Sequence, residues 1–221
     1  AGIPLLEAVR RGFAAEGFSA GVLSAKAGAL GPFAYVMPAL SKDGANAAFY
    51  SDTFRPEGVT RLKLAALTFG ERDGDPNSKR VQALAHACEQ AGIDHVASDR
   101  IAGEQWIKYT FLTTLAAITC LMRGDVGSIV ATGNGVPLVQ ALYAECLAVA
   151  EAAGQPVPEK PQQIALKSLT QPGSTMKASM LRDLEAGLPV EAAHIVGDML
   201  ARAGKAGIAA PLLQAAWCHL Q

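Results

Sequence analysis

The sequence carries little charge and no excess of either sign. Its 19 Lys and Arg residues nearly balance its 20 Asp and Glu residues, and charged residues make up only 18% of the chain. Without a strong positive field, the chain has no long-range attraction for a phosphate backbone or an anionic lipid surface. We therefore expect no nucleic acid and no membrane among its partners. Half of the residues are hydrophobic, which indicates a globular chain with a sizeable core and excludes intrinsic disorder.

Cysteine pairs and metal-binding spacings are also lacking. The four cysteines are Cys88, Cys120, Cys146 and Cys218, and no two of them have C-x-x-C spacing. This argues against a structural zinc site or a redox pair, so no metal is expected. The first three lie in apolar helical patterns, which is typical of buried free thiols in a reducing compartment, and we predict a cytoplasmic protein.

No uncharged apolar run reaches the ~18–20 residues that a transmembrane helix needs. The longest candidate is 111–122, and no signal peptide is recognisable. The chain opens with Ala-Gly-Ile-Pro instead of Met and ends within an apolar helical pattern. We therefore expect it to be a piece of a longer protein.

Two domains are predicted, 1–75 and 76–221, joined at the polar stretch 71–79. The first contains one short helix from Pro4 to just before Gly17 and several short strands. The second is mostly helical, so the fold class is α+β with α dominant. The predicted strands lie at 21–24, 33–37, 47–53, 61–69 and 93–97, and the predicted helices at 81–88, 102–122, 137–153, 162–169, 180–185, 190–203 and 211–220, with a loop at 155–161.

A glycine loop for nucleotide binding is nearly absent. The nearest match is Gly133-Asn134-Gly135, which follows the apolar run 128–131 and precedes a helical pattern. Its third glycine position is Leu138, and no suitable acid follows about twenty residues later. We interpret this segment as a plain helix start with Pro137 in the first turn, and no GxxxxGK[ST] motif is present. The cofactor-binding residues stay unknown.

Lys108 is the first candidate for chemistry. It lies in the apolar helical pattern 102–122, with Trp106 and Phe111 near it at helical spacing. Such a lysine either extends its ammonium group to water while its apolar stem is buried, or is held in place for a functional role. Desolvation would lower its pKa and make it a usable proton donor near neutral pH.

Three further polar residues have a structural and a functional interpretation. Glu191 follows Pro189-Val190 and either complements a helix N-terminus or acts in a site. With His194 it forms a single E-x-x-H pair, which is a weak metal signal without a second copy. Ser179 and Asp183 lie one turn apart and either cap the segment after residue 173 or share a functional helix face.

Taken together, the second half resembles the C-terminal helical domain of the ketopantoate reductase (2-dehydropantoate 2-reductase) family. The main string runs from Ser179 to Glu191 and reads SMLRDLEAGLPVE. It is followed by Gly197, Gly207-Ile208 and Pro211, and preceded by Ala91-Gly92-Ile93, Ser98-Asp99 and Trp106-Ile107-Lys108. The resemblance covers about 58–221.

The resemblance implies a fold and a reaction. The helical domain would be of the 6-phosphogluconate dehydrogenase C-terminal type, preceded by the tail of an incomplete Rossmann-like domain without its glycine-rich part. The complete protein would be a cytoplasmic, homodimeric NADPH-dependent oxidoreductase of pantothenate biosynthesis that reduces a 2-keto acid. This piece alone would be inactive.

The resemblance also implies residue roles. Lys108 corresponds to the catalytic lysine that protonates the carbonyl oxygen, and Glu191 to the acid that binds substrate and supports the lysine. Ser179 corresponds to a substrate-binding serine, and Asp183 to a motif acid that holds the loop.

Two positions depart from the family pattern. Leu112 and Ala116 stand where the family places asparagines, four and eight residues after the lysine, and an apolar group there removes hydrogen bonds to substrate. The alternatives are a reductase of the same fold with a more apolar substrate, or a non-catalytic helical dimerisation module.

Overall fold

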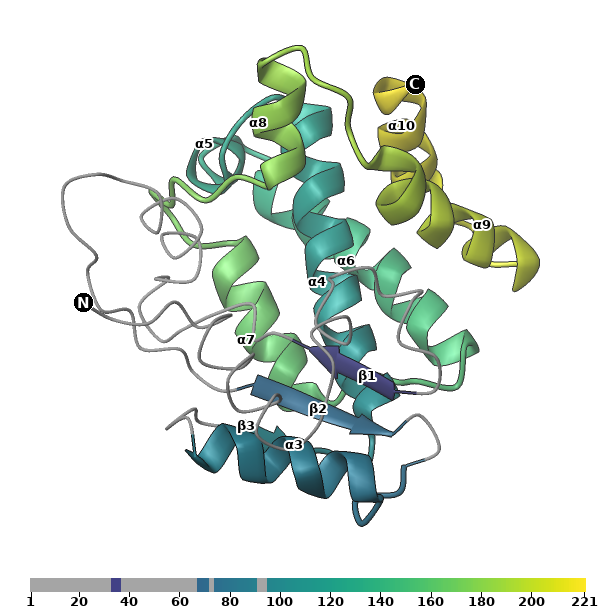
Figure 1. Ribbon diagram of the computed structural model, residues 1–221. Helices are drawn as coiled ribbons and strands as arrows, with labels where there is room; N and C mark the ends of the chain where they lie inside the picture. The colour runs from purple at the N-terminus through teal and green to yellow at the C-terminus, as the bar shows by residue number, and fades with distance from the viewer. Residues whose placement is uncertain (1–32, 37–66, 72–73, 91–94) are drawn as a thin grey trace, which may run out of the picture. The chain divides into compact units, whose positions relative to one another are not determined.

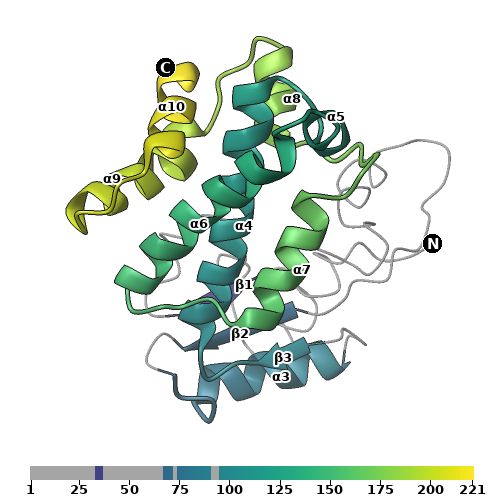
Figure 2. The same ribbon diagram turned by 180° about the vertical axis from the view of Figure 1, so that it is seen from behind.

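The computed structural model describes residues 33–36, 67–71, 74–90 and 95–221 (Figures 1 and 2). The chain divides into two compact units, 1–105 and 106–221. Helices account for most of the described residues, which confirms the predicted α+β fold with α dominant. The helix predicted after Pro4 and the strands predicted at 21–24 and 47–53 lie outside the described residues.

The described part of the first unit is a small sheet with one connecting helix. Its strands are β1 (Phe33–Val36), β2 (Leu67–Glu71) and β3 (His95–Ala97), in the order β1-β2-β3. β1 is antiparallel to β2, and β2 is parallel to β3. Helix α3 (Lys79–Gln90) links the parallel strands and buries Val81, Leu84, Ala87 and Cys88. The helix predicted around 81–88 and the strand ending at residue 97 are thus confirmed, and β1 falls within the predicted strand 33–37.

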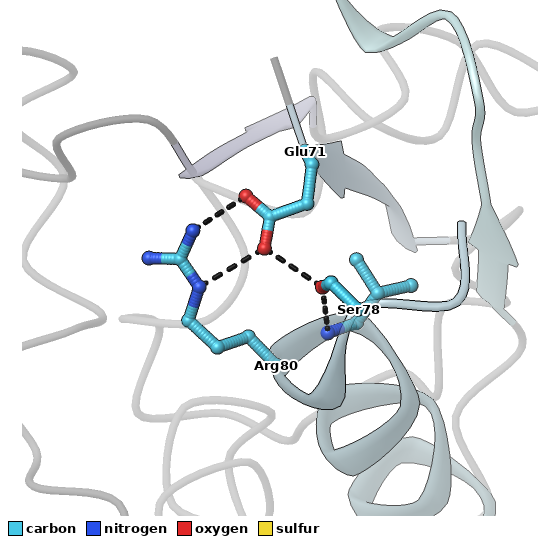
Figure 3. Close-up of polar contacts among 4 residues, drawn as sticks. Glu71, Ser78 and Arg80 are labelled. Carbon is cyan, nitrogen blue, oxygen red and sulfur yellow. Dashed lines mark hydrogen bonds and ion pairs between the residues drawn. The ribbon is translucent and has the colours of Figure 1, made fainter. Parts of the chain in front are cut away.

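A buried carboxylate at the end of β2 holds the start of α3 (Figure 3). Glu71 is only 4% exposed and accepts hydrogen bonds from Ser78 Oγ at 2.7 Å, Arg80 Nε at 2.9 Å and Arg80 Nη2 at 2.6 Å. Ser78 Oγ in turn accepts the N–H of Val81 at 3.1 Å and caps the helix. The described part of the stretch 71–79 is therefore an ordered turn, and a domain boundary near residue 75 stays a prediction.

The second unit is helical throughout its regular structure. Long helix α4 (Ile101–Met122) begins in the first unit and continues into the second. Both views show α9 and α10 on the opposite side of α4 and α6 from α7 (Figures 1 and 2). The remaining helices are α5 (Val126–Val130), α6 (Gly135–Ala152), α7 (Glu159–Leu169), α8 (Ser179–Glu185), the π-helix η2 (Ala193–Gly197), α9 (Asp198–Lys205) and α10 (Pro211–Leu220).

The apolar run that precedes Gly133-Asn134-Gly135 lies largely in helix α5. Asp125 caps α5 by accepting the N–H of Ser128 at 2.7 Å. The predicted start of a helix at Gly133-Asn134-Gly135 is confirmed, because α6 begins at Gly135. A Cβ at Gly135 would collide with the carbonyl oxygen of Ile129, so this glycine permits the close approach of α5 and α6.

Two other elements differ in their bounds. The predicted loop 155–161 is shorter, because α7 begins at Glu159. The predicted helix 190–203 contains a π-helical turn before it continues as α9. Among the described helices, α6 alone is long and apolar enough to cross a membrane, a profile shared by core helices of globular domains, and α6 buries Val139, Leu142 and Cys146.

Candidate functional site

Lys108 lies two turns into α4, where the helix belongs to the second unit. Its side chain is half-buried, and burial lowers the pKa of its ammonium below the usual value of 10.5. The cause is desolvation, since a charged ammonium loses hydration when apolar atoms surround its stem. Lys108 is therefore a weaker base than an exposed lysine, and its catalytic role stays a prediction.

The two positions one and two turns after Lys108 differ in exposure. Leu112 is 36% exposed, whereas Ala116 is 3% exposed and belongs to the core. Residues at i and i+4 share a helix face, so the Leu112 side chain neighbours Lys108 at the surface of α4. Leu112 is one of five large hydrophobic residues that are exposed in the described part of the chain.

Ser179 and Asp183 both lie on α8. Ser179 is the exposed first residue of the helix, and the N-cap is Ala178, so Ser179 is not a cap. Asp183 is half-buried, and its carbonyl accepts the N–H of Leu188 at 2.8 Å, which closes the turn at Gly187. This bond uses the backbone of residue 183 and does not involve the Asp183 carboxylate, so the roles of Ser179 and Asp183 both stay predictions.

Glu191 is exposed and lies just before the helical segment that contains η2. Its carbonyl accepts the N–H of His194 at 3.2 Å. Within the residues that the structure describes, Lys108 and Glu191 do not form an ion pair with each other, and no group of three His, Cys, Asp or Glu residues could hold a metal. The structure thus places Glu191 at a helix start, and its function stays a prediction.

A polar cluster beside Lys108 was not predicted from the sequence. The Tyr109 hydroxyl lies 2.8 Å from Asp198 Oδ2 and 3.0 Å from the carbonyl oxygen of Ile195. Arg202 Nε donates to the same Asp198 oxygen at 2.6 Å, and its guanidinium lies over the Trp106 ring, 5.4 Å from the centroid. The only local signal was the i, i+4 spacing of Asp198 and Arg202, because Tyr109 and Asp198 lie 89 residues apart in the sequence.

Hydrogen bonding and burial both shift pKa values in this cluster, in opposite directions for Asp198 and in the same direction for Tyr109. Burial would raise the pKa of Asp198, but the hydrogen bonds from Arg202 and Tyr109 bring it below the usual value. Burial and the bond to Asp198 raise the pKa of Tyr109, which keeps its proton available as a donor. Tyr109 directly follows Lys108, and Ile195 lies four residues after Glu191, so the cluster joins the two segments that carry the predicted site.

The segment that leads into α8 is tied to α5. The N–H of Val126 donates to the Met176 carbonyl at 3.0 Å, and the N–H of Gly127 donates to the Ser174 carbonyl at 2.7 Å. A Cβ at Gly127 would lie 2.6 Å from Ser174 N, so only glycine permits this approach. These contacts fix the chain a few residues before Ser179.

The described residues do not fit a dinucleotide pyrophosphate. The nearest glycine pair, Gly133 and Gly135, connects two helices, whereas a dinucleotide loop follows a strand. Gly135 packs against the carbonyl oxygen of Ile129, where a Cβ would collide. The parts of the chain that the structure describes therefore offer a half-buried lysine but no nucleotide-binding loop.

The helical second unit matches the C-terminal domain of a family of oxidoreductases. Residues 100–221 match the family described as "Ketopantoate reductase PanE/ApbA C terminal". The chain belongs to this family, which confirms the resemblance found in the sequence.

Two curated relatives carry the similarity further. An uncharacterized oxidoreductase, YkpB of Bacillus subtilis, is 32% identical over 153 residues, which are 69% of this chain and 50% of that protein. A 2-dehydropantoate 2-reductase of Mesorhizobium japonicum is 30% identical over 136 residues, 62% of this chain and 41% of that protein. The chain thus spans about half the length of the first curated relative and less than half the length of the second.

Solved structures share the fold. The 2-dehydropantoate 2-reductase from Methylococcus capsulatus is 33% identical with a TM-score of 0.59, over 69% of this chain and 48% of that one. A dimeric ketopantoate reductase from Staphylococcus aureus (21%, TM-score 0.61, 72% of this chain and 53% of that one) and a D-mandelate dehydrogenase with NADH (19%, TM-score 0.59, 70% and 52%) are similar in fold alone.

Proposed function

We propose that the protein containing this chain reduces the carbonyl group of 2-dehydropantoate or a related 2-keto acid to the 2-hydroxy acid. The observation that carries the proposal is the half-buried Lys108 on an apolar helix of a ketopantoate reductase domain. Its ammonium would donate a proton to the carbonyl oxygen, and its positive charge would stabilise the alkoxide that develops there. Burial supports this role because it moves the pKa of the lysine towards neutrality.

The other predicted residues have supporting roles in this proposal. Glu191 binds the substrate near the reacting oxygen and supports Lys108, and Ser179 binds the substrate from the start of α8. Asp183 holds the turn that connects α8 to the Glu191 segment.

The hydride donor is proposed to be NADPH. The described residues do not hold a pyrophosphate, so its binding site would be formed by other parts of the protein. The D-mandelate dehydrogenase of similar fold was solved with NADH, and both cofactors therefore belong in the assay. A cytoplasmic location and a homodimer are part of the proposal, and the dimeric Staphylococcus aureus reductase is consistent with the latter.

Leu112 favours a second candidate, a reductase of the same fold with a more apolar substrate. Its exposed side chain neighbours Lys108 and can make no hydrogen bond to a polar substituent. A 2-keto acid with a branched or aromatic side chain would bury Leu112 and gain ~25 cal/mol per Å² of apolar surface removed from water. A non-catalytic dimerisation module is the third possibility.

An absorbance assay of the nicotinamide cofactor separates these candidates. The whole protein that contains this chain is assayed with NADPH or NADH against 2-dehydropantoate and against 2-keto acids with branched or aromatic side chains. We expect Lys108→Ala to lower kcat by ~100-fold or more, whereas the matched control Lys167→Ala, on the exposed face of α7, leaves it unchanged. Unchanged turnover in Lys108→Ala would remove the lysine from the mechanism, and no turnover of any keto acid would favour the module.

A further inference from the structure

We propose that Tyr109 is a positioning residue, whose hydroxyl fixes the rotation of α4 and thereby the direction of Lys108 relative to the segment that carries Glu191. The roles of Lys108 and Glu191 in this inference rest on the proposed function. The contacts that carry it are two short distances from one hydroxyl, whose single proton is shared between Asp198 Oδ2 at 2.8 Å and the Ile195 carbonyl oxygen at 3.0 Å.

Helix geometry links the Tyr109 contacts to Lys108. Successive residues of an α-helix are rotated by about 100°, so Trp106 and Tyr109 lie only about 60° apart on α4. Their rings are in contact, with centroids 5.6 Å apart. Lys108 is rotated by about 100° from Tyr109, on the neighbouring face. Anchoring Trp106 and Tyr109 therefore sets the face of α4 from which the Lys108 side chain projects.

The partner segment is unusual and held from two sides. Ile195 lies at the centre of η2, and single π-helical turns are rare and frequent at functional sites. The Tyr109 hydroxyl contacts η2 from α4, whereas α10 contacts it through Trp217: a Cβ added at Gly197 would lie 3.0 Å from that ring. Glu191 precedes η2 by two residues, so the position of η2 limits where its carboxylate can lie.

The charged members of the cluster support the hydroxyl. Asp198 accepts from both Tyr109 and Arg202, and Arg202 is further held by the Trp106 ring. A phenylalanine at 109 would fill the same space, so the hydroxyl adds polar contacts and not volume. Hydrogen bonds to a charged acceptor are shorter and about twice as strong as those between neutral groups.

Tyr109→Phe tests the inference, and Tyr143→Phe is the matched control. Tyr143 is also buried in the second unit, and its hydroxyl lies near Thr110 without a hydrogen bond of standard geometry to any described residue. We expect Tyr109→Phe to lower kcat by ~10-fold or more with a smaller change in KM, because a small misplacement of a reacting group costs rate more than binding. Asp198→Asn should lower kcat similarly, and the double variant should be no worse than either single one.

A second readout does not depend on turnover. The pKa of Lys108 is measured by NMR of labelled lysine, with the signal assigned from Lys108→Arg. We expect it to rise towards the usual lysine value in Tyr109→Phe, because a loosened turn hydrates the ammonium, and to stay unchanged in Tyr143→Phe.

The two failures are distinguishable. If the wild-type protein reduces no keto acid, the proposed function fails, and the Lys108 pKa alone decides whether Tyr109 positions the lysine. A Tyr109→Phe protein with the wild-type kcat and Lys108 pKa would overturn the inference. The inference would also be overturned if Tyr109→Phe lowers the melting temperature but, while folded at the assay temperature, keeps the wild-type kcat and Lys108 pKa.

Discussion

The carboxylate of Glu145 in α6 caps α10 by accepting the backbone N–H of Leu213 at 2.9 Å, and its other oxygen accepts the N–H of the preceding Leu212 at 3.0 Å. These two N–H groups belong to the first turn of α10, where no partner exists within the helix. The N-cap residue Ala210 supplies no side-chain hydrogen bond. Glu145, 68 residues away in the sequence, therefore acts as the N-terminal cap of α10.

We predict that Glu145→Ala lowers the free energy of unfolding by ~1–2 kcal/mol, because two N–H groups and the positive end of a helix lose their acceptor. Thermal or urea unfolding measures the change. The control is Glu151→Ala, an exposed glutamate on the same helix whose carboxylate forms no hydrogen bond with the described residues. Equal stability of the two variants would contradict the capping role.

Gly127 gives a second prediction, concerning the contact between α5 and the segment before Ser179. In Gly127→Ala, the new methyl group would meet the backbone of residues 173 and 174 at 2.6–2.8 Å. Backbone atoms cannot move aside as a flexible side chain can, so we expect a loss of ~1–3 kcal/mol of stability. The measurement is chemical unfolding of the purified variant.

Gly133→Ala is the matched control for Gly127→Ala. A Cβ at Gly133 would meet nothing within 4 Å, so its stability should change by less than ~1 kcal/mol. If both alanine variants unfold at the wild-type denaturant concentration, the close approach of Gly127 to Ser174 is not needed for the fold.

Periodicity was sufficient to predict the long elements. α4, α6 and α10 were predicted within one or two residues at each end, because each has an apolar pattern over ten or more residues, and Pro211 marks the start of the last one. The five-residue helix α5 was missed because it is shorter than two helical turns, and its apolar run 128–131 has no periodicity that separates helix from strand.

The contacts that organise the candidate site could not be read from the sequence. Lys108 was singled out because a charge stands in an apolar helix, which is a local pattern. Tyr109 and Glu145 follow no such pattern: each acquires its partner only when α9 or α10 packs against α4 or α6, and their sequence neighbours do not reveal it. The π-helical turn was hidden for the same reason, since its Ile195 carbonyl is bonded from a distant helix.

Asp198 leads to a prediction about acid pH. Its pKa is lower in the folded protein than its usual value of 3.8 because of the hydrogen bonds from Arg202 and Tyr109, which outweigh burial. A carboxyl group with a depressed folded pKa stabilises the fold above its unfolded pKa, and this contribution is lost as the pH falls through the folded pKa. The contribution is therefore complete above about pH 5 and disappears progressively below about pH 4.

The comparison of wild type with Asp198→Asn isolates this contribution. We expect the wild type to melt at a higher temperature near neutral pH and the difference to shrink as the pH approaches about 3, because the protonated aspartate then resembles the amide in charge. Asp99→Asn, an exposed aspartate of the first unit that forms no ion pair within the described residues, should show no such convergence. If the difference in melting temperature between wild type and Asp198→Asn stays constant from neutral to acid pH, the Asp198 charge does not stabilise the fold. The cluster would then hold η2 only through the contact of the Tyr109 hydroxyl with the Ile195 carbonyl and the contact of Arg202 with the Trp106 ring.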